Sequence, residues 1–372
     1  MVNESEFFAE FARLKQEAGS HSPSIFSLLK KFPEVSIKVD ACFLCNPYAF
    51  DLFYNRFKKA DFEKYIKFYP PQNHEVALNI SKFRGIPADR ILIGNGAIEI
   101  IETLFGNCQN MKILMPIPTF SSYYESSNKD NTIITYQLSE DNDYKINVDE
   151  FINYIHESNP DYVLLVNPNN PTGGILTSDE IKKIHQNLKE SAFLVVDESF
   201  IDFADENHSI EKYATEHSNI IVIRSLSKDF GIAGLRLGYA IMPKKNRDSL
   251  LEKSFLWNSN GIAYFFTELL AEDKFQKEYE IAKKEYAEAR NDFYKDLVNI
   301  GVDVIPSQAN FFMIKTPGPA EEYFTKLLYR YGIYTRILKD KWGLSGEWIR
   351  IASKDRKENR QMIAAIKKVW NE

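Results

Sequence analysis

Cysteine is scarce in this sequence: only Cys42, Cys45 and Cys108 occur among 372 residues. So few cysteines, in an odd number, argue against a disulfide-stabilised secreted scaffold and predict a protein of the reducing cytoplasm. Cys42 and Cys45 have the CxxC spacing found in some zinc and redox sites. A zinc site needs four ligands, and the chain has neither a second CxxC nor a His-x-x-x-His pair. Ordinary packing is therefore the favoured interpretation, and we expect no metal.

Long apolar runs are also absent. No stretch approaches the roughly 20 apolar residues of a membrane-spanning helix, and the acidic segment 1–6 lacks the apolar core of a signal peptide. The net charge of −6, with lysines interspersed among glutamates, argues against the basic face that binds nucleic acids. We therefore expect a cytoplasmic protein with a small-molecule substrate, and neither a membrane nor a nucleic acid as partner.

The remaining composition is that of an ordinary globular protein, with 44% apolar and 26% charged residues. A chain of 372 residues exceeds most single cores, which predicts one large and one small domain. Continuously apolar segments predict buried strands at 91–93, 112–115, 162–166, 192–196, 220–223 and 237–242. We expect the last four of these strands to be parallel.

Helical patterns lie between several of these strands. Thr177 and Glu180 form a capping-box sequence that opens a helix to about Glu190. Alternation of strands and helices predicts an α/β fold with a mostly parallel central sheet flanked by helices. Helices over about 250–297, short strands within 302–314 and 334–351, and a final helix over 357–370 predict a small α+β domain.

The most informative segment is Ser225-Leu226-Ser227-Lys228, with Arg236 eight positions after the lysine. A lysine amine forms Schiff bases with carbonyl groups. Two hydroxyls and an arginine are suited to binding a phosphate dianion. A cofactor that carries both an aldehyde and a phosphate is pyridoxal 5'-phosphate (PLP), and the segment therefore predicts a PLP site.

The run from Ser225 to Tyr239 resembles the cofactor-lysine motif of the fold-type I PLP-dependent enzymes, in the aminotransferase class I/II group. The resemblance extends from about Asp40 to Asn359. Within the group, the chain is most similar to the histidinol-phosphate aminotransferase and threonine-phosphate decarboxylase branch, and to aminotransferase domains fused to nucleotidyltransferases. The resemblance implies a large PLP-binding domain over residues 40–260 and a small domain made of residues 1–39 with 261–372.

Asp197 ends a buried apolar segment and is followed by Glu198-Ser199-Phe200. A buried aspartate needs a cationic partner, and the protonated ring nitrogen of PLP is one. The segment resembles the family's Asp-Glu-Ala-Tyr sequence, which places Asp197 on the cofactor aspartate. Phe200 departs from the tyrosine of many histidinol-phosphate aminotransferases, and phenylalanine resembles the decarboxylase-like members instead.

Two further turns are candidates for binding the cofactor. Asn167-Pro168-Asn169-Asn170-Pro171-Thr172-Gly173 matches a family motif, which implies that Asn170 donates to the phenolic oxygen of PLP. Gly94-Asn95-Gly96 precedes a predicted helix start, where the free N–H groups of Ala97 and Ile98 should bind the cofactor phosphate. Ile98 departs from the aspartate found there in many histidinol-phosphate aminotransferases.

The resemblance implies roles for five more side chains. Phe120 stacks on the cofactor ring, unless it is simply a core residue. Arg350 binds the substrate carboxylate, and Arg336 contacts the substrate phosphate or forms a surface salt bridge. Asn46 lies over the substrate, and Tyr69 reaches the active site of a second subunit, which implies a homodimer. Residues 255–262 are expected to influence substrate choice.

The function expected first is therefore a PLP-dependent aminotransferase acting on a small, phosphorylated or otherwise anionic substrate, with an amino acid such as glutamate as amino donor. Lys228 would bind the cofactor and then move protons as general base and acid. The alternative is a PLP-dependent decarboxylase of serine phosphate or threonine phosphate, which Phe200 and the Gly-Asn-Gly-Ala turn favour. A non-catalytic PLP-fold module is disfavoured because Lys228, Asp197, Asn170 and Arg236 are all retained.

Overall fold

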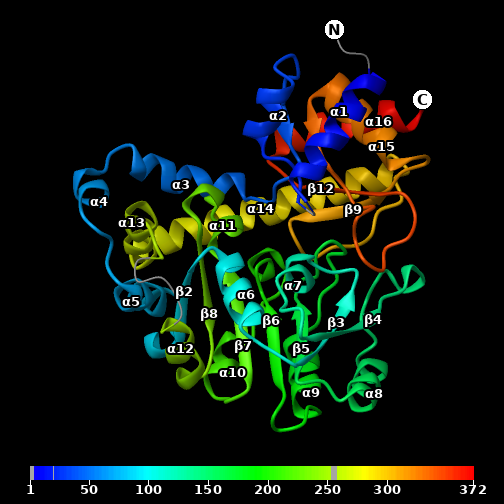
Figure 1. Cartoon of the computed structure of the whole chain (residues 1–372). Helices are drawn as coiled ribbons and strands as arrows, with labels where there is room; N and C mark the ends of the chain where they lie inside the picture. The colour runs from blue at the N-terminus through cyan, green and yellow to red at the C-terminus, as the bar shows by residue number, and fades with distance from the viewer. Residues whose placement is uncertain (1–3, 20, 253–257) are drawn as a thin grey trace.

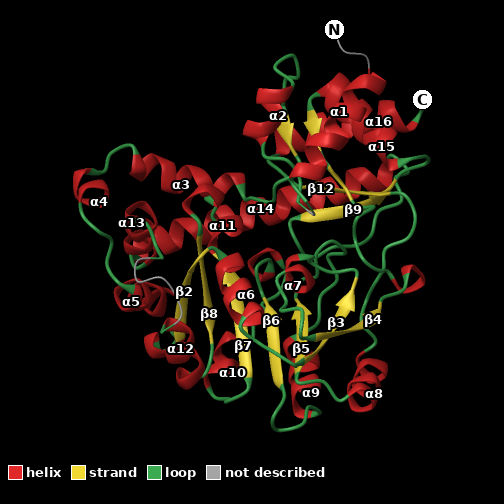
Figure 2. Cartoon of the chain, in the orientation of Figure 1, coloured by secondary structure: helices red, strands yellow, loops and turns green. Residues whose placement is uncertain are grey.

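The computed structural model describes residues 4–19, 21–252 and 258–372 (Figures 1 and 2). A large lobe holds a seven-stranded sheet, and a smaller lobe holds both ends of the described chain. The sheet has the order β2 (Ile91–Asn95), β8 (Leu237–Ile241), β7 (Ile220–Ser225), β6 (Phe193–Asp197), β5 (Tyr162–Val166), β3 (Lys112–Ile117) and β4 (Thr132–Gln137).

Six of these strands lie where apolar runs predict them, but β8 is not parallel to its neighbours. It pairs antiparallel with both β7 and β2, whereas β3 to β7 pair in parallel. The prediction of a parallel strand at 237–242 is therefore wrong. The link from Ser225 to Leu237 is shorter than most crossovers between parallel strands, and a continuous apolar run reports burial on both faces rather than direction.

Helices cover both faces of the sheet because its strand residues alternate between two apolar cores. One core packs against α5 (Asn73–Arg84), α8 (Val148–Ser158), α9 (Ser178–Gln186), α10 (Glu211–Thr215) and α13 (Gly261–Leu270). The other packs against α6 (Ala97–Gly106), α7 (Ser122–Glu125) and α12 (Lys244–Leu251). The capping box predicted at Thr177 and Glu180 is present and opens α9, which ends at Gln186.

The small lobe is built on a three-stranded antiparallel sheet in the order β11 (Arg336–Ile337), β12 (Trp348–Ala352), β9 (Phe311–Lys315). A short parallel pair joins β1 (Val39–Asp40) to β10 (Ile333–Tyr334). The helices α1 (Glu4–Glu17) and α2 (Ile25–Lys31) share an apolar core with residues of α15 (Ala320–Thr325) and the turn that follows it. The last helix, α16 (Arg356–Trp370), packs beside β9 and β12.

Two helices extend from the lobes as an arm, α3 (Pro47–Phe57) and α4 (Glu63–Lys67) (Figure 1). α3 lies along the long helix α14 (Asp273–Asn299), which reaches both lobes. Phe275 and Tyr279 of α14 join the core of the large sheet, whereas Phe293 and Leu297 join the core of the small one. The domain boundary between residues 260 and 261 stays a prediction, and the packing changes from one core to the other within α14. No helix in the described ranges is long and apolar enough to cross a membrane.

Candidate active site

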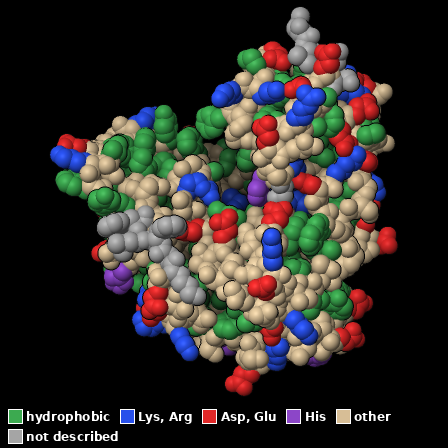
Figure 3. Space-filling view, viewed as in Figure 1, with side chains coloured by type: hydrophobic (Ala, Val, Ile, Leu, Met, Phe, Trp, Pro, Cys, Tyr) green, Lys and Arg blue, Asp and Glu red, His purple; other side chains and the backbone are tan. Residues whose placement is uncertain are grey.

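A cavity of about 510 Å³ lies where the two lobes meet, at the carboxyl ends of the central parallel strands. The last residues of β5, β6 and β7 line it, and so do side chains of the small lobe. Figure 3 shows the molecule hollowed between the lobes, with Lys, Arg and His side chains in the hollow. The lining includes these residues predicted from the sequence: Ala97, Ile98, Phe120, Asn170, Asp197, Ser225, Ser227, Lys228, Arg236, Arg336 and Arg350.

Two predicted residues lie elsewhere. Asn46 is buried outside the cavity lining, and its Oδ1 caps α3 by accepting from the N–H groups of Tyr48 and Ala49. Its backbone N–H donates to the carbonyl of Lys228 at 2.8 Å, so Asn46 helps to hold the backbone at Lys228. Tyr69 is 80% exposed, beyond α4 on the arm. Of the segment 255–262, residues 255–257 lie outside the described residues.

Lys228 lies in the one-turn helix α11 (Leu226–Asp229) directly after β7. Burial lowers the pKa of its ammonium group, and Arg236 lowers it further, while the charge of Asp197 acts in the opposite direction. The Nζ atom lies 4.9 Å from the centre of the Phe200 ring. A lowered pKa increases the fraction of neutral amine, which is the form that attacks a carbonyl carbon.

Asp197 ends β6 and is 3% exposed. Its two carboxylate oxygens accept from the hydroxyl of Tyr123 at 2.7 Å and from the N–H of Ser199 at 2.8 Å. Burial and the charge of Asp197 raise the pKa of Tyr123, so this tyrosine stays a donor. These bonds fix the direction in which the carboxylate faces the cavity.

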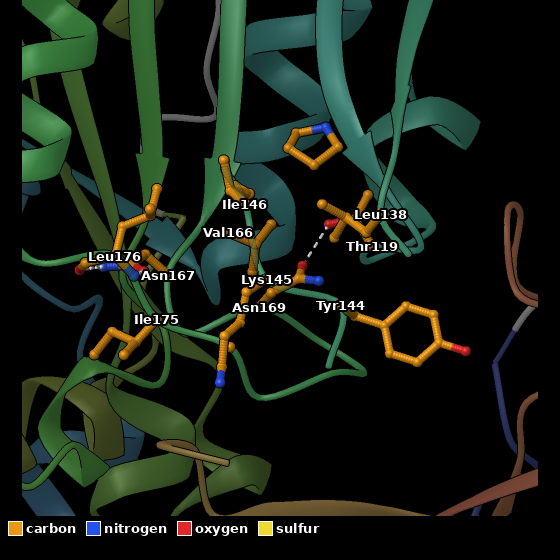
Figure 4. Close-up of a pocket in the computed structure, with 12 residues that line it drawn as sticks. Thr119, Leu138, Tyr144, Lys145, Ile146, Val166, Asn167, Asn169, Ile175 and Leu176 are labelled. Carbon is orange, nitrogen blue, oxygen red and sulfur yellow. Dashed lines mark hydrogen bonds between the residues drawn. The ribbon is translucent and has the colours of Figure 1, made fainter. Parts of the chain in front are cut away.

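The loop that carries Asn170 is held in place by hydrogen bonds of Asn167 and Asn169, on the side away from the cavity. Asn167 exchanges two hydrogen bonds with the backbone of Leu176, at 2.7 and 3.0 Å. Asn169 accepts from the hydroxyl of Thr119 at 3.0 Å, and both pairs flank the small pocket shown in Figure 4. This pocket has room for about one water molecule and lies beside the cavity rather than in it. The loop is thereby fixed so that the side chain of Asn170 faces the larger cavity.

One end of the cavity has the donors that a phosphate group needs. Ser227 Oγ is buried and has no hydrogen-bond partner among the described residues. The guanidinium of Arg236 packs on Gly96, where an added Cβ would lie 2.4 Å from Nη2. An added Cβ at Gly238 of β8 would likewise lie 2.4 Å from the N atom of Ala97, so glycine allows the start of α6 to pack against this strand. The donor set and its orphaned hydroxyl therefore fit a phosphate dianion.

A second group of cations lies at the small-lobe end. Arg336 is 5% exposed, and its Nη2 bonds both oxygens of Asp340 at 2.8 and 2.6 Å. Arg336 thus forms an ion pair, but a buried one rather than the surface salt bridge considered from the sequence, and it also lines the cavity; its contact with a substrate phosphate stays a prediction. Lys341 lines the cavity beside it, and burial together with Arg336 lowers the pKa of Lys341 to about 7. His21 also lines this end.

Sequence reasoning missed Lys341 and His21 because no motif surrounds them. Lys341 lies in the link between β11 and β12, and His21 lies in the link between α1 and α2. A lysine that follows Lys339 and Asp340 in a link is predicted to be a surface residue. Only the fold brings these two links to the same cavity.

Arg350 connects the two ends of the cavity and the two lobes. It lies on β12, donates from Nη1 to Asn170 Oδ1 at 2.7 Å, and donates from Nη2 to the carbonyl of Cys42 at 3.0 Å. Burial lowers the pKa of Arg350 to about 10, which leaves it charged at neutral pH. Its Nε–H is buried and has no hydrogen-bond partner in the described part of the chain. Because Arg350 uses the Oδ1 of Asn170, the NH₂ group of Asn170 remains the donor for the cavity.

Beneath the lysine, a network of buried charges supports the strand ends. Arg224 of β7 bonds Glu198 at 3.1 Å and also contacts Asp202, which Arg84 bonds at 2.8 Å. Asp229, next to Lys228 in the chain, belongs to this network and accepts from the hydroxyl of Tyr279 at 3.3 Å. Glu198 directly follows Asp197, and Asp229 directly follows Lys228. The network therefore stabilises the backbone next to both of these cavity-lining residues.

With this geometry in place, the comparisons identify the family. The model of aminotransferase class I and II matches residues 53–366. The L-serine phosphate decarboxylase of Campylobacter jejuni is 41% identical, over 96% of this chain and 95% of that protein. The solved structure of a decarboxylase from Sulfurospirillum multivorans has a TM-score of 0.93 at 40% identity, covering 99% of this chain and 97% of that one. The histidinol-phosphate aminotransferase of Clostridium acetobutylicum has a TM-score of 0.80 at 27% identity, covering 90% and 99%.

The chain belongs to aminotransferase class I and II, has the fold of the fold-type I PLP enzymes, and its cofactor is PLP. The fold class and the cofactor predicted from the sequence are confirmed. The reaction expected first, transamination, is not confirmed. A relative that is 41% identical along almost the whole chain is a decarboxylase, whereas the histidinol-phosphate aminotransferase structure is 27% identical. The expected aminotransferase with glutamate as amino donor is therefore wrong.

Replacing Asp229 with asparagine should change how stability depends on pH. Burial, with the neighbouring charge of Asp202, raises the pKa of Asp229 from 3.8 to about 7. The folded state therefore keeps a proton that the unfolded state has lost, and this contribution to stability disappears as pH rises from about 4 through 7. Urea unfolding should show that the wild type loses on the order of 2 kcal/mol more than Asp229→Asn between pH 5.5 and pH 8.

Asp149→Asn provides the matched control, because Asp149 is a solvent-exposed carboxylate paired with Lys183. Its stability should follow the wild-type pH dependence. Equal pH slopes for wild type and Asp229→Asn would contradict the assignment of a proton to Asp229.

Proposed function

We propose that this protein is a PLP-dependent decarboxylase of L-serine phosphate. The observation that carries the substrate class is the second cationic group, Arg336, Lys341 and Arg350, which lies in the cavity apart from the donors around Ser227 and Arg236. One phosphate site suits the cofactor, and the other suits a substrate that carries its own phosphate and carboxylate. The relatives that are 41% identical support serine phosphate as that substrate and decarboxylation as the reaction.

The residues present fit PLP at the large-lobe end. Ser225, Ser227, Arg236 and the N–H groups of Ala97 and Ile98 would hold its phosphate. Asp197 would pair with its ring nitrogen, Phe120 would lie against its ring, and the NH₂ of Asn170 would donate to its phenolic oxygen. Phe200 has no hydroxyl to share that last role.

When bound, PLP supplies a ring that accepts the electron pair of a broken bond at the substrate Cα. Arg336, Lys341 and His21 hold the substrate phosphate at the small-lobe end, and Arg350 contacts the carboxylate. The bond between Cα and the carboxylate carbon breaks, carbon dioxide leaves, and Lys228 returns one proton to Cα. Phosphoethanolamine is the product.

The reaction is tested with the PLP-loaded enzyme and radiolabelled serine phosphate. Carbon dioxide and phosphoethanolamine should form in equal amounts, and Lys228→Ala should abolish both because the variant lacks the amine that would bind the cofactor aldehyde and return the proton to Cα. Threonine phosphate, with one extra methyl group, is measured alongside, and a tenfold preference for either substrate corresponds to about 1.4 kcal/mol. Formation of 2-oxoglutarate from glutamate, without release of carbon dioxide, would contradict the proposal.

Lys341→Met should raise the KM for serine phosphate by about 10- to 100-fold, because a charge-assisted hydrogen bond contributes roughly 1.5–3 kcal/mol. The turnover number should change less, since Lys341 lies at the end of the cavity away from Lys228. Lys339→Met is the matched control: Lys339 lies two positions away, pairs with Glu321 and Glu347, and does not line the cavity. Equal KM values for Lys341→Met and Lys339→Met would contradict the proposal that Lys341 binds the substrate phosphate.

We also propose that the enzyme works as a cytoplasmic homodimer in which Tyr69 reaches the second subunit's cofactor phosphate. Tyr69 is 80% exposed and lies outside its own cavity, beside the exposed apolar side chains of Phe68 and Ile66. Mixing equal amounts of inactive Tyr69→Ala and inactive Lys228→Ala should restore about a quarter of the activity, because half of the dimers are hybrids and each hybrid contains one intact site. No recovery in a mixture shown to exchange subunits would contradict this role.

A further inference from the structure

A short segment of the small lobe, residues 338–344 between β11 and β12, reaches across to the large lobe, and we call it the strap. Lys341 Nζ donates to Ser121 Oγ at 3.1 Å, and Gln137 donates to the carbonyl of Gly343 at 2.7 Å. Trp342 stacks face to face on Tyr124 of α7, with ring centres 4.1 Å apart and planes 4° apart. The partners of the strap therefore come from the loop and helix that follow β3 and from the end of β4.

The strap is shaped for this position. Gly343 has a φ of +73°, and an added Cβ would lie 2.7 Å from Gln137 Oε1 and 2.8 Å from the side chain of Ile117. Leu338, at its start, is fully buried in a small core with Leu138. Between these two anchors, only Trp342 provides a large aromatic contact to the other lobe, and Lys341 immediately precedes it.

Trp342 and Tyr124 do not line the cavity, whereas Lys341 does. Trp342 is half exposed, so burial in a core does not explain its orientation. Stacked aromatic rings have a definite geometry and add stabilisation beyond the buried area. In a backbone segment without helix or strand structure, such a contact restricts where the preceding residue can point.

We propose that the Trp342–Tyr124 stack is a positioning pair that keeps Lys341 at the substrate end of the cavity. Affinity for a phosphorylated substrate then depends on an aromatic contact that the substrate never touches. This inference rests on the proposed function, because it takes the substrate phosphate as the group that Lys341 binds.

The charged environment of Lys341 provides a direct way to detect the positioning. The charged groups that act on it come from several elements: Arg336 of β11, Asp340 of the strap, Arg350 of β12, Glu125 at the end of α7, and His21 in the link after α1. Burial and the arginines hold the pKa of Lys341 down. If the strap loosened, water would reach the ammonium group and its pKa would rise toward the usual value.

The first measurement is steady-state kinetics of the holoenzyme with serine phosphate. Trp342→Leu should raise the KM about 2- to 10-fold with little change in turnover number, the range that corresponds to loss of an aromatic pair. Trp342→Phe keeps a ring over Tyr124 and should recover most of the affinity. Wild-type KM in Trp342→Leu would overturn the positioning role, as would an equal loss in Trp342→Phe.

The second measurement needs no catalysis. Competitive labelling of lysines with acetic anhydride at a series of pH values, analysed by mass spectrometry of peptides, gives the ionisation of Lys341 in each protein. The titration of Lys341 should move to higher pH in Trp342→Leu, while that of Lys339 stays in place. An unchanged Lys341 titration would overturn the proposal even if the KM rises.

The two proposals fail in different ways. If Lys341→Met raises the KM and Trp342→Leu does not, the phosphate site remains and the positioning pair is rejected. If Trp342→Leu shifts the Lys341 titration but Lys341→Met leaves the KM unchanged, the strap positions a lysine that does not bind substrate, and the proposed substrate site is rejected.

Discussion

The site depends first on one guanidinium group. Arg350 binds the Asn170 loop of the large lobe and the carbonyl of Cys42 in the segment that leads into the arm. These two bonds place a cation of the small lobe against the strand ends that carry Asp197 and Lys228. Arg350 is half-buried between the lobes, and loss of these hydrogen bonds would leave its charge without these partners. The cavity is therefore a property of both lobes together.

A second constraint is the number of cationic side chains that line the cavity. Arg236, Lys228, Arg350, Arg336 and Lys341 all line the same cavity, and their mutual repulsion costs free energy until anions arrive. A phosphorylated amino acid brings a phosphate and a carboxylate, and PLP brings another phosphate. The charge of the cavity thus suits the cofactor and the substrate of the proposed decarboxylase.

Much of the cofactor end could be predicted because its parts are local in the sequence. A strand followed by a tight turn brings Lys228, Asp197 and Asn170 to the sheet edge, and the short motifs around them are specific. The substrate end could not be predicted in the same way. Lys341 and His21 belong to links without motifs, and only long-range packing brings these links to the cavity. The direction of β8 also escaped prediction, because apolar composition does not encode strand direction.

The reaction was harder to predict than the cofactor for a related reason. The lysine motif and the Asn-Pro loop are expected to hold PLP whichever bond of the substrate breaks, so they carry little information about the choice of reaction. Phe200 favoured decarboxylation, but one missing hydroxyl is a weak signal against several strong motifs. The relatives that are 41% identical, rather than any motif, favour decarboxylation.

The helix α14 has a mechanical consequence. Its 27 residues run unbroken from the core of the large lobe to the core of the small one, with Phe275 anchored in the first and Phe293 in the second. A hinge between the lobes would have to bend this helix or pull a phenylalanine out of a core. The two lobes are therefore joined by one continuous helix packed into both cores, and this helix resists rotation of one lobe against the other.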